Sequence, residues 1–300
     1  MEIVKINFTC EFDKAYNTFT NLINHGYNIK MISALYNIFP YRVIDILLYH
    51  DNVNNLKAIK EYYNSLKIDD NRCLVISDTH IGRLSQNEEE EHYNICMDSH
   101  VHLFNEKGLY NAYSYAYKNN IKNIIHAGDL LEGASNIGAS RVNANNQFKY
   151  LYKKYPNNKD IKTYILYGNH DYNLIRYNGY NDNYFNFNNN IEIIGVNYSY
   201  MSFCNNLVKI SHFCSASKHY KNIQMPFNFE LSGHSHVFSI NEEERLIKVP
   251  SLSCTYSSLS DKGYLELIND ENEYVFKFLD VDSKLKIEKT LSKKINNSYN

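Results

Sequence analysis

Five short apolar runs constrain the fold of this chain more than any other feature of its sequence. Polar residues follow each run, and the runs lie at residues 73–77, 123–127, 163–167, 191–196 and 206–211. Runs of this length are typical of strands that are buried on both faces or in the core of a sandwich. A helical pattern at residues 109–120 lies between the first two runs, which predicts a β-α-β start.

The rest of the chain divides around this strand-rich part. Residues 247–259 and 263–281 have the pattern of further strands joined by hairpin turns. We therefore predict an α/β domain over residues 71–285, followed by a polar tail at 286–300. Apolar residues at three- and four-residue spacing predict a small all-helical module over residues 1–70.

Residues suited to metal binding or proton transfer follow the strand-like segments. In chain order they are Asp78, His80, Asp129, Asn169, His170, Asp171, His212, His234 and His236. Taken singly, each has an ordinary structural explanation, such as a turn cap or a core histidine. If the strands are roughly parallel, however, their carboxyl ends meet at one edge of the sheet, where α/β proteins bind ligands. We therefore expect these side chains to gather in a common site.

The residue types in this set favour two cations. More candidate ligands are present than one tetrahedral zinc ion uses, namely Asp78, His80, Asp129, Asn169, His212, His234 and His236. Mixed histidine and carboxylate sets suit Mn²⁺, Fe or Zn²⁺ better than Mg²⁺, so we expect two divalent metal ions, with Mn²⁺ preferred. A shared carboxylate holds such ions ~3.5–4 Å apart, and Asp129, central in the order, is the candidate. Spacing alone leaves open whether His234 and His236 face one cation or two.

The order of these motifs resembles that of the calcineurin-like metallophosphoesterases. "SDTH", "GD", "GNHD", a histidine and "GHSH" follow one another over about residues 72–240. The resemblance implies a sandwich of two mixed β-sheets flanked by α-helices, with a dinuclear metal site at the strand ends. It also implies a hydrolase that cleaves phosphate esters by attack of a metal-bridging hydroxide.

The resemblance further implies a role for each matching residue. The first metal ion would be bound by Asp78, His80 and His236, and the second by Asn169, His212 and His234. Asp129 would bridge both ions. His170 would contact the phosphate and protonate the leaving group or stabilise the transition state. Asp171 would orient His170 by hydrogen bonding.

Three segments have alternative interpretations. His219 is an alternative ligand to His212, which we prefer because it directly follows an apolar run. The stretch between His80 and Asp129 is longer than compact family members need. It contains the acidic residues 87–92, either a solvated turn or loop or a lid over the substrate. Residues 176–190, rich in Tyr, Phe and Asn, form either a solvated loop or a surface that stacks on bases.

Residues 28–49 resemble a helix-turn-helix unit. Ile32 and Leu35 fall at apolar positions of its first helix, and Val43 falls at a core-facing position of the second. The second helix carries a single arginine, Arg42, together with Asp45, whereas helices that read DNA usually carry more basic residues. A helical packing or oligomerisation module is therefore the alternative to DNA binding.

Composition limits the compartment and the partners. The net charge of −2 predicts no general attraction to nucleic acid or to acidic membranes. Six scattered cysteines, no apparent signal peptide and no apolar stretch of ~18 residues predict a cytoplasmic protein without a membrane partner.

These observations favour a metal-dependent phosphoesterase over other function classes. A phosphodiesterase or nuclease that acts on DNA or RNA is our first hypothesis for the substrate, because of the helix-turn-helix-like segment. A phosphatase of small nucleotides or phosphoproteins is the alternative. A non-catalytic DNA-binding protein that retains the fold ranks below both, because no ligand of the motif set is missing. The oligomeric state and the substrate-binding residues are left open.

Overall fold

The computed structural model divides the chain into two compact units, Met1–Lys67 with Ser215–Pro226, and Ile68–Cys214 with Phe227–Asn300. It describes residues 12–27, 32, 43, 66–82, 102–133, 144–178, 187–196, 198–212, 227–255 and 260–293. In the smaller unit, α1 (Phe12–Asn24) buries Phe19 completely. Ile32 and Val43 are helical and fully buried. The remainder of the helix-turn-helix-like segment lies outside the described residues.

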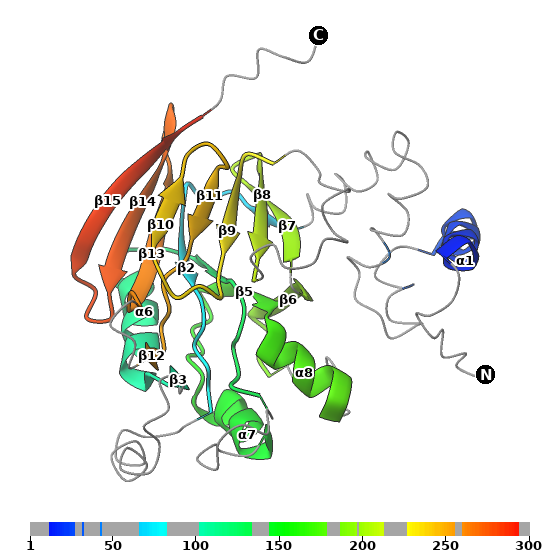
Figure 1. Ribbon diagram of the computed structural model, residues 1–300, viewed down its shortest axis with the longest axis horizontal. Coiled ribbons are helices and arrows are strands. Elements are labelled where there is room, and N and C mark those ends of the chain that lie inside the picture. Colours follow the sequence, from blue (N-terminus) through cyan, green and yellow to red (C-terminus); the bar gives the residue numbers. More distant parts are fainter. Residues whose placement is uncertain are drawn as a thin grey trace. The chain divides into compact units, whose positions relative to one another are not determined.

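The larger unit contains two mixed sheets that share one hydrogen-bonded path (Figure 1). The strands of the first sheet are, in spatial order, β6 (Ile191–Val196), β5 (Lys162–Tyr167), β4 (Asn123–His126), β2 (Arg72–Ile76), β13 (Gly263–Asn269), β14 (Glu273–Asp280) and β15 (Leu285–Ser292). The four strands from β6 to β2 are parallel, whereas β13, β14 and β15 are antiparallel to their neighbours. The parallel strands are the first four predicted apolar runs, and they are almost continuously apolar because both of their faces are covered.

The second sheet begins where β6 meets β7 through a single residue pair, Val196 with Tyr198. Its strands are β7 (Tyr198–Phe203), β8 (Asn206–Ser211), β9 (Phe229–Ser232), β11 (Leu246–Lys248) and β10 (Ser239–Asn241). The strands β8, β9 and β11 run parallel, and β7 and β10 are antiparallel to them. β1 (Lys67–Ile68) pairs with β7. A separate pair joins β3 (His102–Leu103) to β12 (Cys254–Thr255).

Aromatic side chains pack the two sheets against each other. The ring of Phe229 on β9 lies 4.6 Å from the ring of Tyr274 and 5.6 Å from that of Phe276, both on β14. Phe238 contacts Phe278 at 5.4 Å. Phe229, Tyr274 and Phe276 are fully buried. These contacts form the core of a sandwich, so the predicted fold class is confirmed.

Three helices flank the strands, and Figure 1 shows them in the lower half of the view. They are α6 (Glu106–Lys118), α7 (Ala144–Lys154) and α8 (Asn169–Asn178). The side chain of Asn105 caps α6 by accepting the Gly108 N–H at 2.9 Å. The buried face of α6 contacts the sheet through Tyr113, whose hydroxyl lies 2.8 Å from Thr163 Oγ1 on β5. In the part of the chain that the structure describes, no helix combines the length and the apolar character needed to span a bilayer.

The last strand corrects one predicted boundary. Residues 286–292, predicted to belong to a polar tail, form most of β15 and pair with β14 up to Ser292. Their side chains are exposed except for Leu291. Pairing uses main-chain groups, so an edge strand that faces water can be polar throughout and still be a strand.

Candidate metal centre

The site lies where strands of both sheets end. β2 and β4 are parallel, and their pairing continues past the strand ends, with Asp78 N–H donating to Gly128 O (2.9 Å) and His80 N–H to Asp129 O (3.1 Å). β5 ends two residues before Asn169. In the second sheet, β8 leads to His212 and β9 leads to the segment containing His234 and His236. The common edge predicted from the sequence therefore draws on five strand ends.

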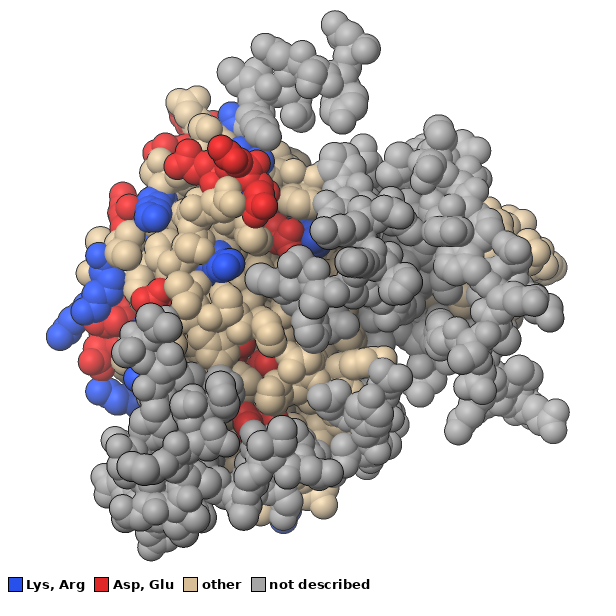
Figure 2. Space-filling view, viewed as in Figure 1, with Lys and Arg blue, Asp and Glu red and all other residues tan. Residues whose placement is uncertain are grey.

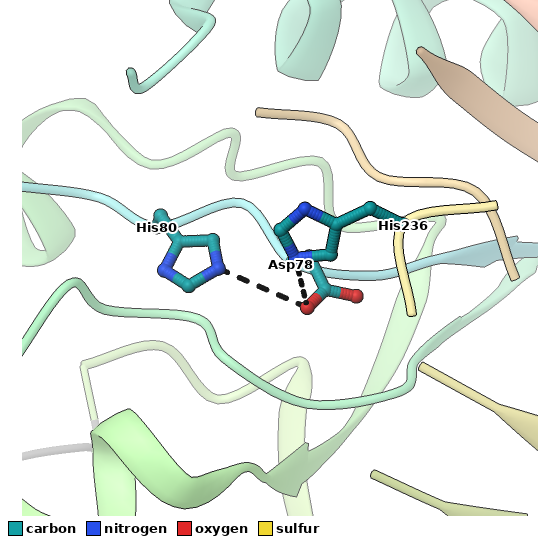
Figure 3. A group of neighbouring side chains, drawn as sticks. All are labelled: Asp78, His80 and His236. Atoms are coloured by element: carbon teal, nitrogen blue, oxygen red, sulfur yellow. Dashed lines mark hydrogen bonds and ion pairs between the residues drawn. The ribbon is translucent and has the colours of Figure 1, made fainter. Parts of the chain in front are cut away.

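One group of candidate ligands consists of Asp78, His80 and His236 (Figure 3). Asp78 Oδ1 lies 3.0 Å from His236 Nε2 and 3.8 Å from His80 Nε2. Its other oxygen, Oδ2, accepts hydrogen bonds from Ser77 Oγ (2.6 Å) and from the His234 N–H (3.0 Å). The protein therefore occupies one oxygen of Asp78 and leaves the other facing these two imidazoles and that of His212, whose Nε2 also lies 3.8 Å away.

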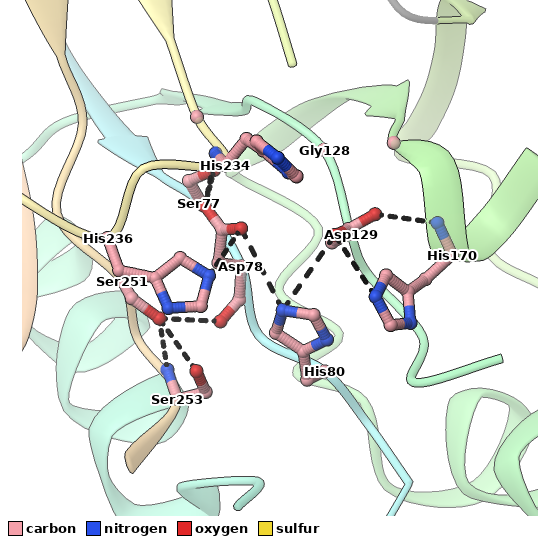
Figure 4. A network of polar contacts seen from close by, with 12 residues as sticks. Ser77, Asp78, His80, Gly128, Asp129, His170, His234, His236, Ser251 and Ser253 are labelled. Atoms are coloured by element: carbon pink, nitrogen blue, oxygen red, sulfur yellow. Dashed lines mark hydrogen bonds and ion pairs between the residues drawn. The ribbon is translucent and has the colours of Figure 1, made fainter. Parts of the chain in front are cut away.

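A second group consists of Asp129, His212 and His234. His212 Nδ1 donates to Ala127 O (2.7 Å), so its Nε2 is the atom that faces Asp129 Oδ2 at 2.9 Å. Asp129 Oδ1 accepts the His170 N–H (2.9 Å). Asp129 Oδ2 also lies 3.8 Å from His80 Nε2, so the carboxylate of the second group faces a ligand of the first (Figure 4).

The donor set fits two divalent cations. Asn169 Oδ1 is buried and has no hydrogen-bond partner among the described residues, as expected of a carbonyl oxygen aimed at a cation. Burial lowers the pKa of His212, but the carboxylates of Asp129 and Asp78 outweigh it and raise this pKa to about 9. The His80 pKa is also raised, with burial opposed by hydrogen bonds to Asp78 and Glu132. The negative potential that attracts protons here equally attracts metal ions.

Most of the candidate ligands have an unusual backbone. Five have a positive φ, in the left-handed region that residues with a Cβ rarely adopt: Asp78 (51°), His80 (46°), Asp129 (53°), His234 (72°) and His236 (56°). Such conformations cost about 1–3 kcal/mol each and are concentrated at functional sites. Because β9 ends at Ser232, His234 and His236 are not on an extended strand. Their side chains lie in different candidate groups, His236 with Asp78 and His80, and His234 with Asp129 and His212.

Two motif glycines leave room for the site. A Cβ on Gly128 would lie 2.1 Å from His212 Nδ1, and the φ of Gly128 is +106°. A Cβ on Gly168 would lie 2.1 Å from Asp129 Oδ1. The glycines of the "GD" and "GNHD" motifs are thus required by close packing around Asp129 and His212.

His170 lies at the accessible side of the site. Its Nδ1 is 2.6 Å from the Glu132 carbonyl oxygen, and its Nε2 is 4.0 Å from Asp129 Oδ2. Its side chain is 21% exposed, compared with 1% or less for His80 and His212. The His170 and His234 side chains are therefore open to solvent and that of His236 is partly so, whereas His80 and His212 are buried.

Asp171 was expected to hydrogen-bond His170, but it does not. Its carboxylate accepts the N–H groups of Leu130 (3.0 Å), Leu131 (2.8 Å) and Gly168 (3.0 Å) instead. Adjacent residues on a helix do not face each other, so Asp171 points to the 130–131 segment while His170 points to Asp129. Burial and the charge of Asp129 raise the pKa of Asp171 to about 7, against the opposing effect of the three N–H donors.

Glu132 is absent from the predicted site residues, although it lies three positions after Asp129. It is 3% exposed, and its Oε2 is 2.8 Å from His80 Nδ1. A metal-binding histidine usually donates its second ring N–H to a carboxylate or carbonyl, which fixes the orientation of the ring. The sequence signal for Glu132 is a carboxylate three positions after the predicted ligand Asp129, because metal-binding histidines need such a partner.

Two serines support the loop of Asp78 from the other side. Ser251 Oγ donates to the Asp78 carbonyl oxygen at 3.0 Å (Figure 4). The Ser253 N–H donates to the same oxygen, also at 3.0 Å. His219, the acidic residues 87–92 and most of residues 176–190 lie outside the described part of the chain. The alternatives given for these three segments therefore stay predictions.

One comparison with known proteins identifies a family for most of the chain. A family model described as calcineurin-like phosphoesterase matches residues 72–276. No curated protein matches the sequence. Among solved structures, the chain is similar to YfcE, a phosphoesterase from E. coli, with 12% identity, a TM-score of 0.43 and coverage of 73% of this chain and 98% of that chain. It is also similar to Vps29 from Entamoeba histolytica in complex with Zn²⁺, with 13% identity, a TM-score of 0.39 and coverage of 74% and 98%.

Proposed function

Because the chain belongs to the calcineurin-like phosphoesterase family, we propose that it is a dinuclear metal-dependent phosphoesterase. The observation that carries this proposal is the convergence of two ligand groups on Asp78 Oδ1 and Asp129 Oδ2. The unpartnered, buried Asn169 Oδ1 supports it. A metal ion at each group would neutralise these carboxylates, which are buried together at short range.

We assign the ligands by the group in which each lies. The first cation would be held by Asp78, His80 and His236, and the second by His212 and His234. Asn169, whose buried Oδ1 has no hydrogen-bond partner among the described residues, is assigned to the second cation by the order of the motifs. Asp129 would bridge both, because its Oδ2 lies 2.9 Å from His212 Nε2 and 3.8 Å from His80 Nε2. Mixed imidazole and carboxylate ligands favour Mn²⁺, with Fe or Zn²⁺ as alternatives.

The reaction we propose needs no covalent intermediate with the protein. Two cations, when bound, would supply an activated water and neutralise charge on the phosphoryl oxygens. His170 Nδ1 faces the Glu132 carbonyl, so this nitrogen carries a hydrogen and Nε2 faces the site. A proton on Nε2 would then pass to the leaving oxygen or stabilise the transition state. Asp171 contributes indirectly, since it holds the main chain of residues 130–131 next to Glu132.

The substrate class is a phosphate ester. A nucleic-acid substrate rests on the helix-turn-helix-like segment, most of which lies outside the described residues. On the coloured part of the visible face, Figure 2 shows basic and acidic side chains interspersed. Along β14 and β15 they pair, as Lys286 does with Asp280 at 3.1 Å. Charges arranged in this way equally suit a small nucleotide or a phosphoprotein. The cytoplasmic location likewise stays a prediction.

Hydrolysis of bis-p-nitrophenyl phosphate with Mn²⁺ tests the proposal. We expect the wild type to be active and to bind two metal ions per chain. Asp129→Ala should abolish activity together with binding of both ions. His170→Ala should lower kcat by about 10²–10⁴-fold with metal content unchanged, because general acid catalysis contributes on that order.

Matched substitutions at exposed positions serve as controls. Asp282→Ala and His25→Ala change the same residue types at exposed positions and should leave activity and metal content unchanged. A wild-type chain that binds two metal ions but hydrolyses no phosphomonoester or phosphodiester would favour the non-catalytic alternative. A chain that binds no transition metal would overturn the proposal altogether.

A further inference from the structure

Two buried polar residues connect the metal-ligand loops without being ligands. Thr79 lies between Asp78 and His80 and is 1% exposed. His126 is the last residue of β4, three positions before Asp129, and is fully buried. Thr79 Oγ1 lies 3.0 Å from His126 Nε2. Neither residue belongs to the ligand groups described above.

The direction of each hydrogen bond in this pair follows from the partners. The Gly128 N–H points to His126 Nδ1 at 3.3 Å, so Nδ1 is an acceptor and the hydrogen is on Nε2. His126 Nε2 therefore donates to Thr79 Oγ1, and the threonine hydroxyl donates to Leu130 O at 2.9 Å. Burial lowers the pKa of His126 to about 3, in agreement with a neutral ring.

The result is a chain of hydrogen bonds from Gly128 through His126 and Thr79 to Leu130. It connects the segment that carries Asp78 and His80 to both sides of Asp129. All three of these ligands have left-handed backbones, and such backbones persist only where the surrounding structure holds them. The main-chain bonds between the loops fix the two segments in register, and the side-chain bonds act at the residue between the two ligands.

We propose that Thr79 and His126 are positioning residues that set the separation of the two metal ions. The inference rests on the proposed dinuclear site. By holding Asp78 and His80 relative to Asp129, the pair determines whether the bridging carboxylate can reach both cations. A purely structural pair at this place would affect the stability of the fold and leave the two metal ions unchanged.

Replacement of the Thr79 hydroxyl tests this proposal. Thr79→Val replaces the hydroxyl by a methyl group of similar size, and Thr79→Ser keeps the hydroxyl. We expect Thr79→Val to weaken Mn²⁺ binding by about tenfold, as loss of outer hydrogen bonds does in other metal sites. It should also reduce the exchange-coupled EPR signal of the Mn²⁺ pair, whereas Thr79→Ser should retain both properties.

His126→Leu tests the same chain from its other end, so either variant decides if the other does not fold. The double variant should lose no more Mn²⁺ affinity than the weaker-binding single variant, because both remove one connected unit. Calorimetric titration of the full chain with Mn²⁺ measures the affinity, and EPR of the loaded protein measures the coupling.

Thr163→Val is the matched control. Thr163 is also a buried threonine, bonded to Tyr113 at 2.8 Å on the far end of β5 from Asn169. Its loss should lower stability without changing Mn²⁺ affinity or the EPR signal. If the wild type binds two coupled Mn²⁺ ions and Thr79→Val and His126→Leu do so equally well, the inference is wrong. If the wild type itself binds fewer than two, the proposed function fails instead.

Discussion

At the residue scale, each of the two central carboxylates uses one oxygen for hydrogen bonds within the protein and directs the other toward candidate metal ligands. Asp78 gives one oxygen to Ser77 and His234 and turns the other toward imidazoles. Asp129 gives one oxygen to the His170 N–H and turns the other toward His212. This division fixes the direction of each carboxylate before any cation binds. Folding therefore holds the two carboxylates close together, although their negative charges repel each other until cations bind.

Glu132 illustrates the same division from outside the ligand set. Replacing it by alanine removes the carboxylate that lies 2.8 Å from His80 Nδ1 and so one of the contacts that orient the ring. We expect Glu132→Ala to lower the affinity for Mn²⁺ by about 10–100-fold, and Glu132→Gln to lower it less, because an amide oxygen still accepts a hydrogen bond. Calorimetric titration with Mn²⁺ measures the change.

Glu266→Gln provides the comparison for Glu132. Glu266 is equally buried but is bonded to Arg72 and to Tyr115, on a different part of the sheet. This variant should bind Mn²⁺ as the wild type does. Equal Mn²⁺ affinity in Glu132→Ala and the wild type would show that His80 needs no partner at Nδ1.

At the element scale, tyrosines join helices α6 and α7 to the sheet. The hydroxyl of Tyr113 on α6 contacts Thr163 on β5 and also donates to Tyr155 Oη at 3.1 Å, just after α7. Burial raises the pKa of Tyr113 to about 12, although both hydrogen bonds oppose this. The elements are therefore held together by hydroxyl groups that must stay protonated.

This raised pKa predicts alkaline instability. Between pH 10 and 12 a tyrosine in the unfolded chain loses its proton while Tyr113 in the folded chain keeps it. Its contribution is complete below pH 10 and is lost as the pH rises toward 12, at about 1.4 kcal/mol per pH unit. Tyr113→Phe should flatten the fall in the free energy of unfolding by that amount, as measured by denaturant titration. The same change at exposed Tyr117 should leave the slope as it is.

At the scale of the whole molecule, the site is assembled from both sheets. Asp78, His80 and Asp129 come from the first sheet, whereas His212, His234 and His236 come from the second. Each ligand group contains residues of both. Bound metal ions would therefore link the two sheets directly, close to where their hydrogen bonding is reduced to the pair Val196 and Tyr198.

Phe229 tests this coupling between packing and metal binding. Phe229→Ala removes the ring that packs β9 against β14 and should lower the free energy of unfolding by about 3–5 kcal/mol. Because cations bind only the folded arrangement, Mn²⁺ should restore part of the loss. Denaturant unfolding with and without Mn²⁺ measures both effects.

Tyr117→Ala, at an exposed aromatic residue, should change stability by about 0.5 kcal/mol or less. Failure of Mn²⁺ to stabilise the folded chain would contradict a site shared by the sheets.

Part of the fold could be predicted because its signals are local. An apolar run reports a buried strand wherever the chain carries it, so β2, β4, β5, β6 and β8 were predicted at nearly their observed positions. The short strand β10 lacks such a run, and it forms because it pairs with β11. The polar β15 is of the same kind, since its pairing with β14 depends on main-chain groups that are identical in every sequence.

By itself, the sequence determined which residue types supply the site and their order along the chain. Only the tertiary structure decided how these residues are shared out. It separated His234 from His236, because left-handed backbones after Gly233 end the alternation of a strand. It turned Asp171 away from His170, because neighbours on a helix diverge. It also brought Glu132 to His80. The sequence gives the chemical type of each residue directly. The direction of a side chain depends on backbone conformation and long-range strand pairing, which a sequence pattern does not contain.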